Sequence, residues 1–343
     1  NFMIKIRLVQ PDLHRNEIAF RPYWRAREVF KQIGIEFITE DASYDFAFIA
    51  QASFIDKQVP LSESTEKGIE FVSKFGKDVL LLDGQDSHSL IGTAEILKGT
   101  DVRVMFKNTL LKNLSQYKQG WVNGRTYWGN GDYSVPYIDD IRDRIKLSGT
   151  NWLSTITPTW YRYDSNKPFD VSCMFSWGDN LNYEYSNLTS LHYDNHRKEL
   201  LKKLENTSYK VTKREKGVRI PQDQFYQNMY NSKIVTAPIG YGEIAVRDIE
   251  AASFGSVLLK PDMSYLDSYP FIYKDKETYI ACKYDWSDVL EKIDYILTNY
   301  NELQPYLTEN IKNEYTQQYS NESLVKYFYN QLSTVQGIGH ENN

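Results

Sequence analysis

Short apolar runs alternate with amphipathic segments through the first third of the chain. We expect strands at five runs rich in β-branched and aliphatic side chains: residues 4–9, 35–38, 46–50, 79–82 and 102–106. Residues 23–33 and 64–75 instead place apolar side chains at the three- and four-residue spacing of a helix face. Short apolar strands separated by helices indicate a parallel sheet that is covered on both faces.

A second series with the same alternation begins near residue 169. We expect strands at residues 169–175, 209–212, 233–239 and 256–260, and helices at residues 192–204, 224–231, 245–254, 287–300 and 323–332. No internal sequence repeat relates the two series. The pattern therefore predicts a second α/β domain.

The segment between the two series, residues 108–164, shows little periodicity. It is rich in Tyr, Trp, Gly and Asn, as in residues 127–131, and Pro136 and Pro158 interrupt it. We expect long loops here with one helix near residues 138–146, leading into a linker.

Together these patterns predict an α/β protein with two Rossmann-like domains in tandem and a cleft between them. The N-terminal domain would span residues 1–150, a linker residues 151–168, and the C-terminal domain residues 169–320. Residues 321–343 would form a C-terminal helix that packs back towards the N-terminal domain. The chain length of 343 residues agrees with two domains, since a domain usually needs about 100–200 residues.

The charge balance argues against some partners. Lys and Arg together number 40 against 45 Asp and Glu, which gives a net charge of −5 and disfavours broad, sequence-independent binding of nucleic acid. No apolar run approaches the roughly 18 residues that would predict a transmembrane segment.

Aromatic side chains make up 15% of the chain, with 27 Tyr. Tyr and Trp combine a flat apolar body with a polar tip, which suits stacking on sugars and on partner surfaces. We expect the Tyr- and Trp-rich stretch from Gly120 to Gly131 to border an acceptor site. A small satellite core built from the same rings is the alternative.

Cysteine use and the N-terminal residues predict a cytoplasmic location. Cys173 and Cys282 allow at most one internal disulfide, which favours a reducing compartment. The apolar run at residues 4–9 is interrupted by Lys5 and Arg7 and lacks a cleavage site, so no signal peptide is expected.

The most informative stretch follows the apolar strand that ends near residue 239. The strand enters Gly240-Tyr241-Gly242, and a helix is expected to open directly afterwards. Glycines permit unusual backbone angles and close approach of a ligand. The free N–H groups and the positive dipole end of a new helix favour a phosphate at this place.

Two side chains of the new helix add chemistry to the turn. Arg247 lies early in the helix, where its planar guanidinium can pair with phosphate oxygens. Glu250 is three residues further and therefore on the same helix face. A carboxylate beside a phosphate cradle is suited to binding ribose hydroxyls.

Two other interpretations of the turn stay open. Residues 240–245 satisfy the dinucleotide fingerprint G-x-G-x-x-A, and Asp262 follows about 20 residues on, after a strand. An NAD-dependent oxidoreductase that uses Gly240-Tyr241-Gly242 is therefore the runner-up, although polar helix residues fit poorly with the close helix–sheet packing of a dehydrogenase. The plainest alternative is a glycine turn that only begins a surface helix.

The stretch resembles glycosyltransferases of the GT-B fold, most closely the exostosin-type group. In that group a serine-lysine strand, a glycine turn and an Arg-x-x-Glu-Ala helix ending in glycine form the donor site. The matching elements here are Ser232-Lys233, residues 238–242, residues 247–251 and Gly255, with further similarity at residues 170–172, 196–201 and 284–289. The resemblance covers about residues 168–335.

One departure from the wider fold is informative. Many retaining members carry two glutamates with seven residues between them in this helix region. The position eight before Glu250 is Gly242, and Glu243 is one place off, so the stereochemical outcome stays open.

The resemblance implies roles for individual residues. Arg247 would hold the donor diphosphate and Glu250 the nucleotide ribose. The remaining donor-binding residues implied by the resemblance are Gly240, Tyr241, Gly242, Glu243 and Arg197. Neither a metal nor a cofactor would be required, since the helix dipole and the guanidinium stabilise the departing nucleoside diphosphate.

The acceptor would lie on the N-terminal domain, at the carboxyl ends of its strands. An inverting transfer needs a carboxylate or an imidazole within hydrogen-bond reach of the acceptor hydroxyl. Our candidates, in order, are Asp86, Asp83 and His14, on the loops after the strands at 79–82 and 4–9. The alternative for each is a strand-ending or helix-capping aspartate, or a solvated histidine.

We therefore predict a cytoplasmic hexosyl- or pentosyltransferase that moves a sugar from a nucleotide sugar to a hydroxyl of a carbohydrate acceptor. His192 and His196 have zinc-like spacing but no third ligand, and no metal site is predicted. The chain has neither G-x-S-x-G nor a P-loop lysine motif, which argues against a serine hydrolase and a Walker-type NTPase. A non-catalytic carbohydrate-binding protein remains the third class.

Overall fold

The computed structural model describes residues 3–9, 13–40, 42–51, 59–85, 87–118, 138–161, 164–177, 187–240 and 242–335, with only the backbone of residues 13–17, 61 and 187–193. The chain divides into two compact units. The N-terminal unit comprises Asn1–Thr155, Leu266–Phe271 and Gln318–Asn343, and the C-terminal unit Ile156–Tyr265 and Ile272–Gln317.

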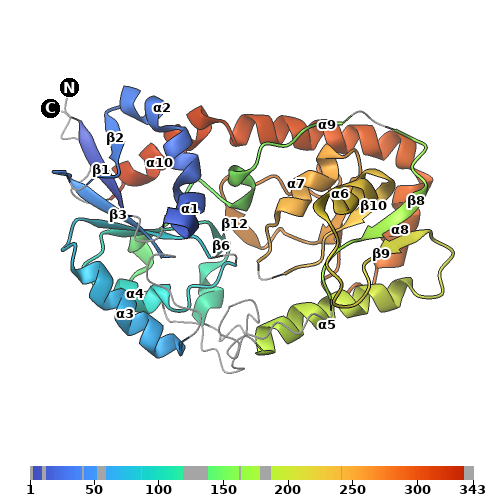
Figure 1. Cartoon of the computed structure of the whole chain (residues 1–343), viewed down its shortest axis with the longest axis horizontal. Helices are drawn as coiled ribbons and strands as arrows, with labels where there is room; N and C mark the ends of the chain where they lie inside the picture. The colour runs from blue at the N-terminus through green and yellow to red at the C-terminus, as the bar shows by residue number, and fades with distance from the viewer. Residues whose placement is uncertain are drawn as a thin grey trace. The chain divides into compact units, whose positions relative to one another are not determined.

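The N-terminal unit is built on a parallel sheet (Figure 1). Within its described residues the sheet has 6 strands in the order β2-β1-β3-β4-β5-β7. The strands are β1 (Ile4–Val9), β2 (Ile35–Ile38), β3 (Phe46–Ala50), β4 (Val79–Asp83), β5 (Val104–Lys107) and β7 (Ile145–Leu147). Because both faces are covered, β3, β4 and β5 are buried along their whole length.

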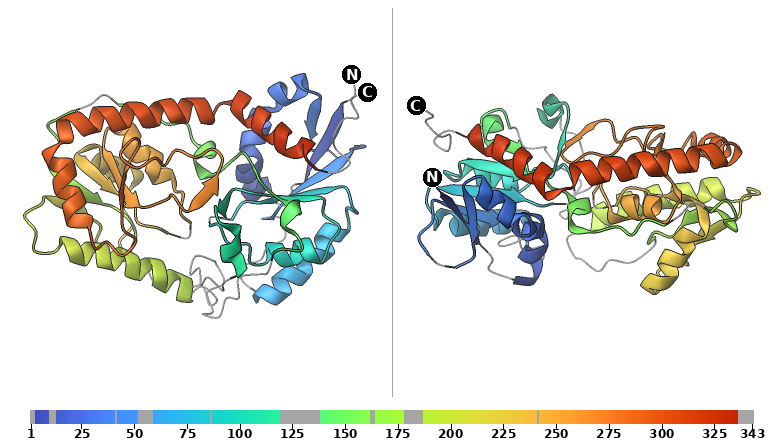
Figure 2. Two further views of the ribbon diagram at one scale, coloured as in Figure 1. Left: turned by 180° about the vertical axis from the view of Figure 1, so that it is seen from behind. Right: turned by 90° about the horizontal axis from the view of Figure 1, so that it is seen from above.

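Helices cover both faces of this sheet. They are α1 (Leu13–Arg25), α2 (Arg27–Gln32), α3 (Leu61–Ser73), α4 (Thr93–Lys98) and, from the end of the chain, α10 (Asn321–Ser333). Figure 1 shows α3 and α4 on the opposite side of the sheet from α1, α2 and α10. In the views of Figure 2, α10 lies against the N-terminal elements, and Phe328 is fully buried in their core.

Phe328 is at the centre of an aromatic core. Its ring centroid lies 4.8 Å from that of Phe106, 5.1 Å from Tyr23 and 5.7 Å from Phe30. Tyr23 and Phe30 pack edge-to-face against Phe328, which adds to the stabilisation that comes from burying the rings. The last helix is therefore part of the N-terminal hydrophobic core.

The C-terminal unit has a second parallel sheet. Its described residues form 5 strands in the order β13-β11-β10-β8-β9. These are β8 (Phe169–Cys173), β9 (Val211–Lys213), β10 (Ser232–Thr236), β11 (Val257–Pro261) and β13 (Ile280–Cys282). The helices of this unit are α5 (Asn187–Leu204), α6 (Gln222–Tyr230), α7 (Val246–Ser253), α8 (Val289–Thr298) and α9 (Tyr300–Gln318).

The two sheets share one topology. In each, the second strand pairs with one side of the first, and the third, fourth and fifth strands follow on its other side. The order in which strands are added to the sheet thus reverses between β1 and β3 in one unit and between β8 and β10 in the other, while all these strands stay parallel. Open α/β sheets bind their ligands at such a switch point, outside the carboxyl ends of the strands. The predicted fold class, two Rossmann-like α/β domains, is confirmed.

A short return of the chain also belongs to the N-terminal unit. β12 (Leu266–Ser268) pairs antiparallel with β6 (Thr109–Leu111), and the segment ends at Phe271. Sequence patterning did not predict this return, because three residues of strand leave no readable period.

One predicted helix differs from the structure, and one long helix was not predicted. The helix expected near residues 138–146 is wrong: a 3₁₀ turn, η3 (Arg142–Arg144), leads into β7, which pairs with β5. Ile138 and Ile141 are buried at a spacing that imitates a helix face. Helix α9 escaped prediction because it is polar and contains Pro305, and its buried side chains are restricted to Tyr300, Gln304, Leu307 and Ile311.

Candidate functional site

The candidate site lies at the carboxyl edge of the C-terminal sheet. β8 leads into residues 174–177, and β10 into residues 237–245, which end at the first turn of α7. These loops flank the point where the strand order reverses, between β8 and β10. Parallel α/β sheets place ligands at this position.

Arg197 and the glycine turn are adjacent. Nη1 of Arg197, on α5, donates a hydrogen bond of 2.7 Å to the carbonyl oxygen of Ser176. A Cβ at position 240 would lie 3.0 Å from Nη2 of Arg197. Gly240 does not have a positive φ, so the close approach of this guanidinium, rather than an unusual backbone angle, favours glycine there.

Arg214 is a second cation beside Ser176 and was not among the predicted residues. Its Nη1 donates to Oγ of Ser176 at 2.5 Å, and its Nε donates to the carbonyl oxygen of Val218 at 2.9 Å. The segment after β8 is thus held between the guanidinium groups of Arg197 and Arg214. Arg214 follows the short strand β9 in a run of charged residues, so the sequence did not indicate that it would contact Ser176.

Arg247 lies in the first turn of α7. Its Nε is buried, and no described residue accepts a hydrogen bond from it. The guanidinium packs over the ring of Phe225, 5.5 Å from the centroid. Burial lowers the pKa of Arg247, while Asp248 and Glu250 oppose that shift and Arg214 adds to it. The side chain therefore retains a buried donor that a ligand could use.

The backbone of the same turn has free donors. Within the described residues, no acceptor binds the N–H groups of Val246 or Arg247, the first two positions of the helix. First-turn N–H groups and the helix dipole together favour an anion. Backbone and side chain of Arg247 thus offer donors to the same kind of ligand.

Glu250 lies one turn further along α7. Its Oε1 accepts a hydrogen bond of 3.0 Å from the hydroxyl of Tyr226, which in turn accepts one of 2.6 Å from Gln222. Burial raises the pKa of Glu250, and Tyr226 and Arg247 oppose that shift. The predicted proximity of Arg247 and Glu250 is thus present, and Tyr226 orients the carboxylate.

A buried ion pair lies beneath the first turn of α7. Asp248 and Lys260 are almost fully excluded from solvent, and Nζ of Lys260 lies 3.1 Å from Oδ2 of Asp248. Asp248 also accepts hydrogen bonds from the hydroxyl of Tyr273 at 2.5 Å and from the backbone N–H of Ala245 at 3.0 Å. The pair was missed by sequence analysis, although a lysine inside a fully buried strand signals a partner.

The other predicted donor-site residues are placed as follows. Glu243 is fully buried, and the carbonyl oxygen of Gly242 accepts a hydrogen bond of 3.3 Å from the N–H of Gly240. Tyr241 lies outside the described residues. The binding roles of these residues stay predictions.

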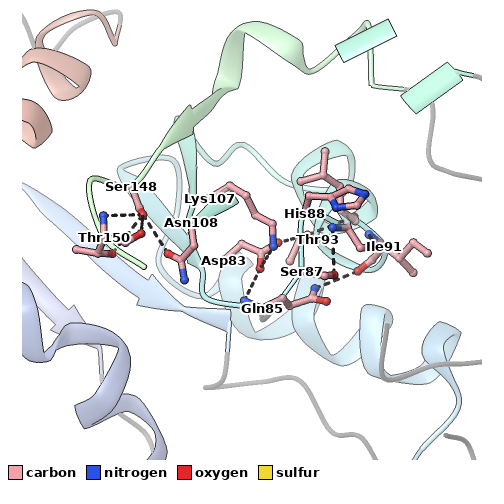
Figure 3. Close-up of polar contacts among 12 residues, drawn as sticks. Asp83, Gln85, Ser87, His88, Ile91, Thr93, Lys107, Asn108, Ser148 and Thr150 are labelled. Carbon is pink, nitrogen blue, oxygen red and sulfur yellow. Dashed lines mark hydrogen bonds and ion pairs between the residues drawn. The ribbon is translucent and has the colours of Figure 1, made fainter. Parts of the chain in front are cut away.

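On the N-terminal unit, Asp83 is engaged in a buried polar network at the carboxyl ends of β4 and β5 (Figure 3). The sheet register pairs Asp83 directly with Lys107, and Nζ lies 3.0 Å from Oδ1. Oδ1 also accepts from the N–H of Gln85 at 2.9 Å, and Oδ2 from the hydroxyl of Thr93 at 2.6 Å. Asp83 has no exposed surface, and its carboxylate holds the beginning of the loop to Thr93.

The structure does not describe the side chains of the other two candidate bases. Asp86 lies outside the described residues, and His14 is in α1 with only its backbone described. Oδ1 of Asn108 accepts a hydrogen bond of 3.0 Å from Ser148 (Figure 3). Nδ2 of Asn108 lies 4.0 Å from a Cβ built at Gly84. These polar groups follow β4, β5 and β7 at the same sheet edge.

Among the described residues, no group of three or more His, Cys, Asp or Glu side chains could hold a metal ion. No helix in the same part of the chain has the length and apolar character needed to cross a membrane.

Comparison with known proteins gives structural likenesses only. No protein-family model matches the chain, and no curated protein is similar to it in sequence. A sucrose-phosphate synthase from Thermosynechococcus elongatus is similar in structure at 11% identity, with a TM-score of 0.49 over 96% of this chain and 99% of that one.

Two further solved structures are similar over nearly the whole chain. A glycosyltransferase from Rickettsia africae shares 12% identity, with a TM-score of 0.40 over 98% of this chain and 100% of that one. A protein from Listeria monocytogenes described as a UDP-N-acetylglucosamine 2-epimerase shares 9% identity, with a TM-score of 0.45 over 97% and 96% of the two chains.

Proposed function

We propose that this protein is a glycosyltransferase that moves a sugar from a nucleotide-sugar donor to a hydroxyl of a carbohydrate acceptor. The observation that carries the proposal is the convergence of anion-binding groups at the switch point of the C-terminal sheet. Arg197 lies against Gly240, and Arg247 offers a buried Nε at the N-terminus of α7. A diphosphate is the ligand whose charge and oxygen count match this set of donors.

Glu250 would bind the ribose of the nucleotide. Its Oε1 is held by Tyr226, and it lies on the same helix as Arg247. A carboxylate that is oriented by a neighbour and next to a phosphate site can accept hydrogen bonds from vicinal hydroxyls. The motif around Arg247 and Glu250 also supports the exostosin-type group within the GT-B fold.

The departing nucleoside diphosphate needs stabilisation of its negative charge. In this proposal the guanidinium groups of Arg197 and Arg247 and the N-terminus of α7 provide it, so the transfer does not require a metal. Preorganised donors act without reorganisation at the moment of reaction, which makes them effective for charge that develops in the transition state.

Asp86 is the proposed general base, with His14 next. Asp83 was also a candidate, but Lys107, Thr93 and the N–H of Gln85 use its carboxylate. We therefore assign Asp83 a positioning role: it holds the start of the loop on which Asp86 lies. The acceptor hydroxyl would then lose its proton to Asp86 as the sugar is transferred.

The geometry of the turn favours a nucleotide sugar over NAD. In the dinucleotide fingerprint the glycines open the helix directly and the third small residue packs inside it. Here α7 begins at Val246, and Ala245 has an extended backbone before the helix. Asp248 is buried in the first turn, where a dehydrogenase needs close apolar packing.

A thermal-shift panel of UDP, GDP, dTDP, CMP and NAD tests the proposal. We expect one nucleoside phosphate to raise the melting temperature and NAD to have no effect. Arg247→Ala should remove the response, while Arg27→Ala, which deletes an exposed guanidinium of the other unit, should keep it. A response to NAD alone would favour the oxidoreductase.

Product analysis separates transfer from the other chemistries. The nucleotide sugar of the responding base is incubated with glycan acceptors, and the products are followed by NMR. A new glycosidic bond supports the proposal. Glycan binding with an intact donor would instead identify a non-catalytic carbohydrate-binding protein.

A further inference from the structure

The ion pair beneath α7 lies in the same helical turn as Arg247. Asp248 follows Arg247 directly, and its carboxylate accepts hydrogen bonds from Ala245, Tyr273 and Lys260. The bond from the N–H of Ala245 ties the carboxylate to the residue before the helix. Asp248 therefore fixes the backbone turn that presents the free N–H groups.

This arrangement places a negative charge at the end of the helix that is meant to attract an anion. An uncompensated carboxylate here would repel a diphosphate, since charges interact strongly where solvent is excluded. Lys260 removes that conflict, because its ammonium lies 3.1 Å from Oδ2 and 3.2 Å from Oδ1 of Asp248. Burial lowers the pKa of Lys260, and Asp248 and Glu243 oppose that shift.

The availability of Arg247 depends on the same charge balance between Asp248 and Lys260. Without Lys260, Arg247 would be the cation closest in sequence to the buried charge of Asp248. A guanidinium that compensates an internal carboxylate presents a weaker positive potential to an anionic ligand. Because Lys260 neutralises Asp248, the guanidinium of Arg247 remains available to an external anion.

We infer that the Asp248–Lys260 pair is a positioning and charge-balancing element of the anion site: Asp248 fixes the first turn of α7, and Lys260 cancels its charge so that a diphosphate can bind. The inference rests on the proposed function in that the anion is the diphosphate of the donor. It adds that Lys260 controls affinity for that group without being part of the ligand contact.

A charge cycle tests the inference with inorganic pyrophosphate as the probe. Binding to the wild type, Lys260→Met, Asp248→Asn and the double variant is measured by calorimetry at low ionic strength, with circular dichroism to check folding. We expect Lys260→Met to weaken pyrophosphate binding about tenfold or more. The double variant should return to within about threefold of the wild type, because it removes both charges.

Lys203→Met is the matched control, since it deletes an exposed lysine of α5 in the same unit. It should leave pyrophosphate binding unchanged. A double variant that binds no better than Lys260→Met would overturn the inference, because the loss would then not come from the uncompensated charge of Asp248. The thermal stability of each variant is recorded beside its affinity.

If Lys260→Met does not fold, Asp248→Asn tests the charge-balancing role on its own. Asparagine keeps an oxygen for the N–H of Ala245 but carries no charge, so pyrophosphate should bind at least as tightly as in the wild type. Weaker binding would contradict the charge-balancing role. A wild type that binds a nucleoside diphosphate but not pyrophosphate overturns this inference alone, whereas one that binds neither overturns the proposed function as well.

Discussion

The side-chain amide of Asn151 donates a hydrogen bond of 2.8 Å to the carbonyl oxygen of Pro270, 119 positions further along the chain. Oδ1 of the same amide accepts from the hydroxyl of Tyr319 at 3.1 Å and from the N–H of Leu153 at 3.0 Å. One buried side chain thus joins three separate pieces of the N-terminal unit. These pieces are far apart in the sequence, and Asn151 adds polar contacts to the apolar packing of α10 and the pairing of β12 with β6.

Asn151→Ala is therefore expected to lower the free energy of unfolding by about 2–4 kcal/mol, because it leaves several buried polar groups without partners. Urea unfolding followed by fluorescence measures the change. Asn151→Asp keeps the acceptor for Tyr319 and Leu153, but it buries a charge and turns a carboxylate oxygen towards the carbonyl oxygen of Pro270, so its loss should be at least as large. A clearly smaller loss for Asn151→Asp would contradict this account.

The buried pair of Asp83 and Lys107 predicts a second stability cycle. Lys107→Met leaves the Asp83 carboxylate buried without its cation and should cost about 3–5 kcal/mol. Asp83→Asn combined with Lys107→Met removes both charges and should cost less than Lys107→Met alone. Additive losses in urea unfolding would show that the two groups do not interact.

Measurements of transfer activity should distinguish the role of Asp86 from that of Asp83. Asp86→Asn is expected to keep donor binding and to lower kcat at least about a hundredfold, as expected for loss of a general base. Asp83→Asn should lower stability as well, because it disturbs the network with Thr93 and Lys107. An active Asp86→Asn variant would assign the base elsewhere, and His14→Ala would be tested next.

Arg197 is expected to contribute to donor affinity through its charge. Arg197→Ala should weaken binding of the responding nucleoside diphosphate about ten- to a hundredfold, the value of one charge-assisted hydrogen bond. Binding of the corresponding nucleoside, measured by calorimetry, should stay within about twofold. An equal loss for both ligands would instead indicate that Arg197 only supports the loop through Ser176.

Lys167 predicts a pH dependence of stability. Its Nζ donates to the carbonyl oxygens of Tyr230 at 2.6 Å and Phe254 at 2.9 Å, at the ends of α6 and α7, and to Oγ of Ser256 at 3.0 Å. Burial lowers the pKa of Lys167 to about 7, from an ordinary value of 10.5, although Asp164 opposes the shift. The folded chain therefore loses this proton before the unfolded chain does.

Between pH about 7 and about 10 the unfolded state binds more protons, so stability should rise with pH by up to about 1.4 kcal/mol per unit from this group. Urea unfolding at several pH values in this window measures the slope. Lys167→Met should lack that contribution, while Lys203→Met, an exposed control, should keep it. Equal slopes in wild type and Lys167→Met would contradict the role of Lys167.

Much of the fold could be predicted because apolar runs and glycines report directly on strands and turns. The predicted strands at 4–9, 35–38 and 46–50 match β1, β2 and β3 as the structure has them. The polar helix α9 could not be found, since its buried face is narrow and Pro305 suggests a break. Strand β7 escaped because its pairing with β5 depends on a distant part of the chain.

The candidate site could be predicted only in part. The glycine turn, Arg247 and Glu250 are close in sequence, so a motif reveals them. Asp248 and Lys260 are 12 residues apart, on a helix and the following strand, and their pairing depends on how the two pack. Sequence pattern shows which residues are polar but not which of them meet inside the protein.

The position of Phe328 in the N-terminal core determines when that core can form during synthesis of the chain. Chains usually fold from the N-terminus as they leave the ribosome. Here the aromatic core around Phe106 and Tyr23 cannot close until Phe328 has been translated, although the C-terminal sheet, β8 to β13, is already complete by Cys282. The unit that begins the chain is therefore the last to finish folding, and its apolar strands need protection from aggregation in the meantime.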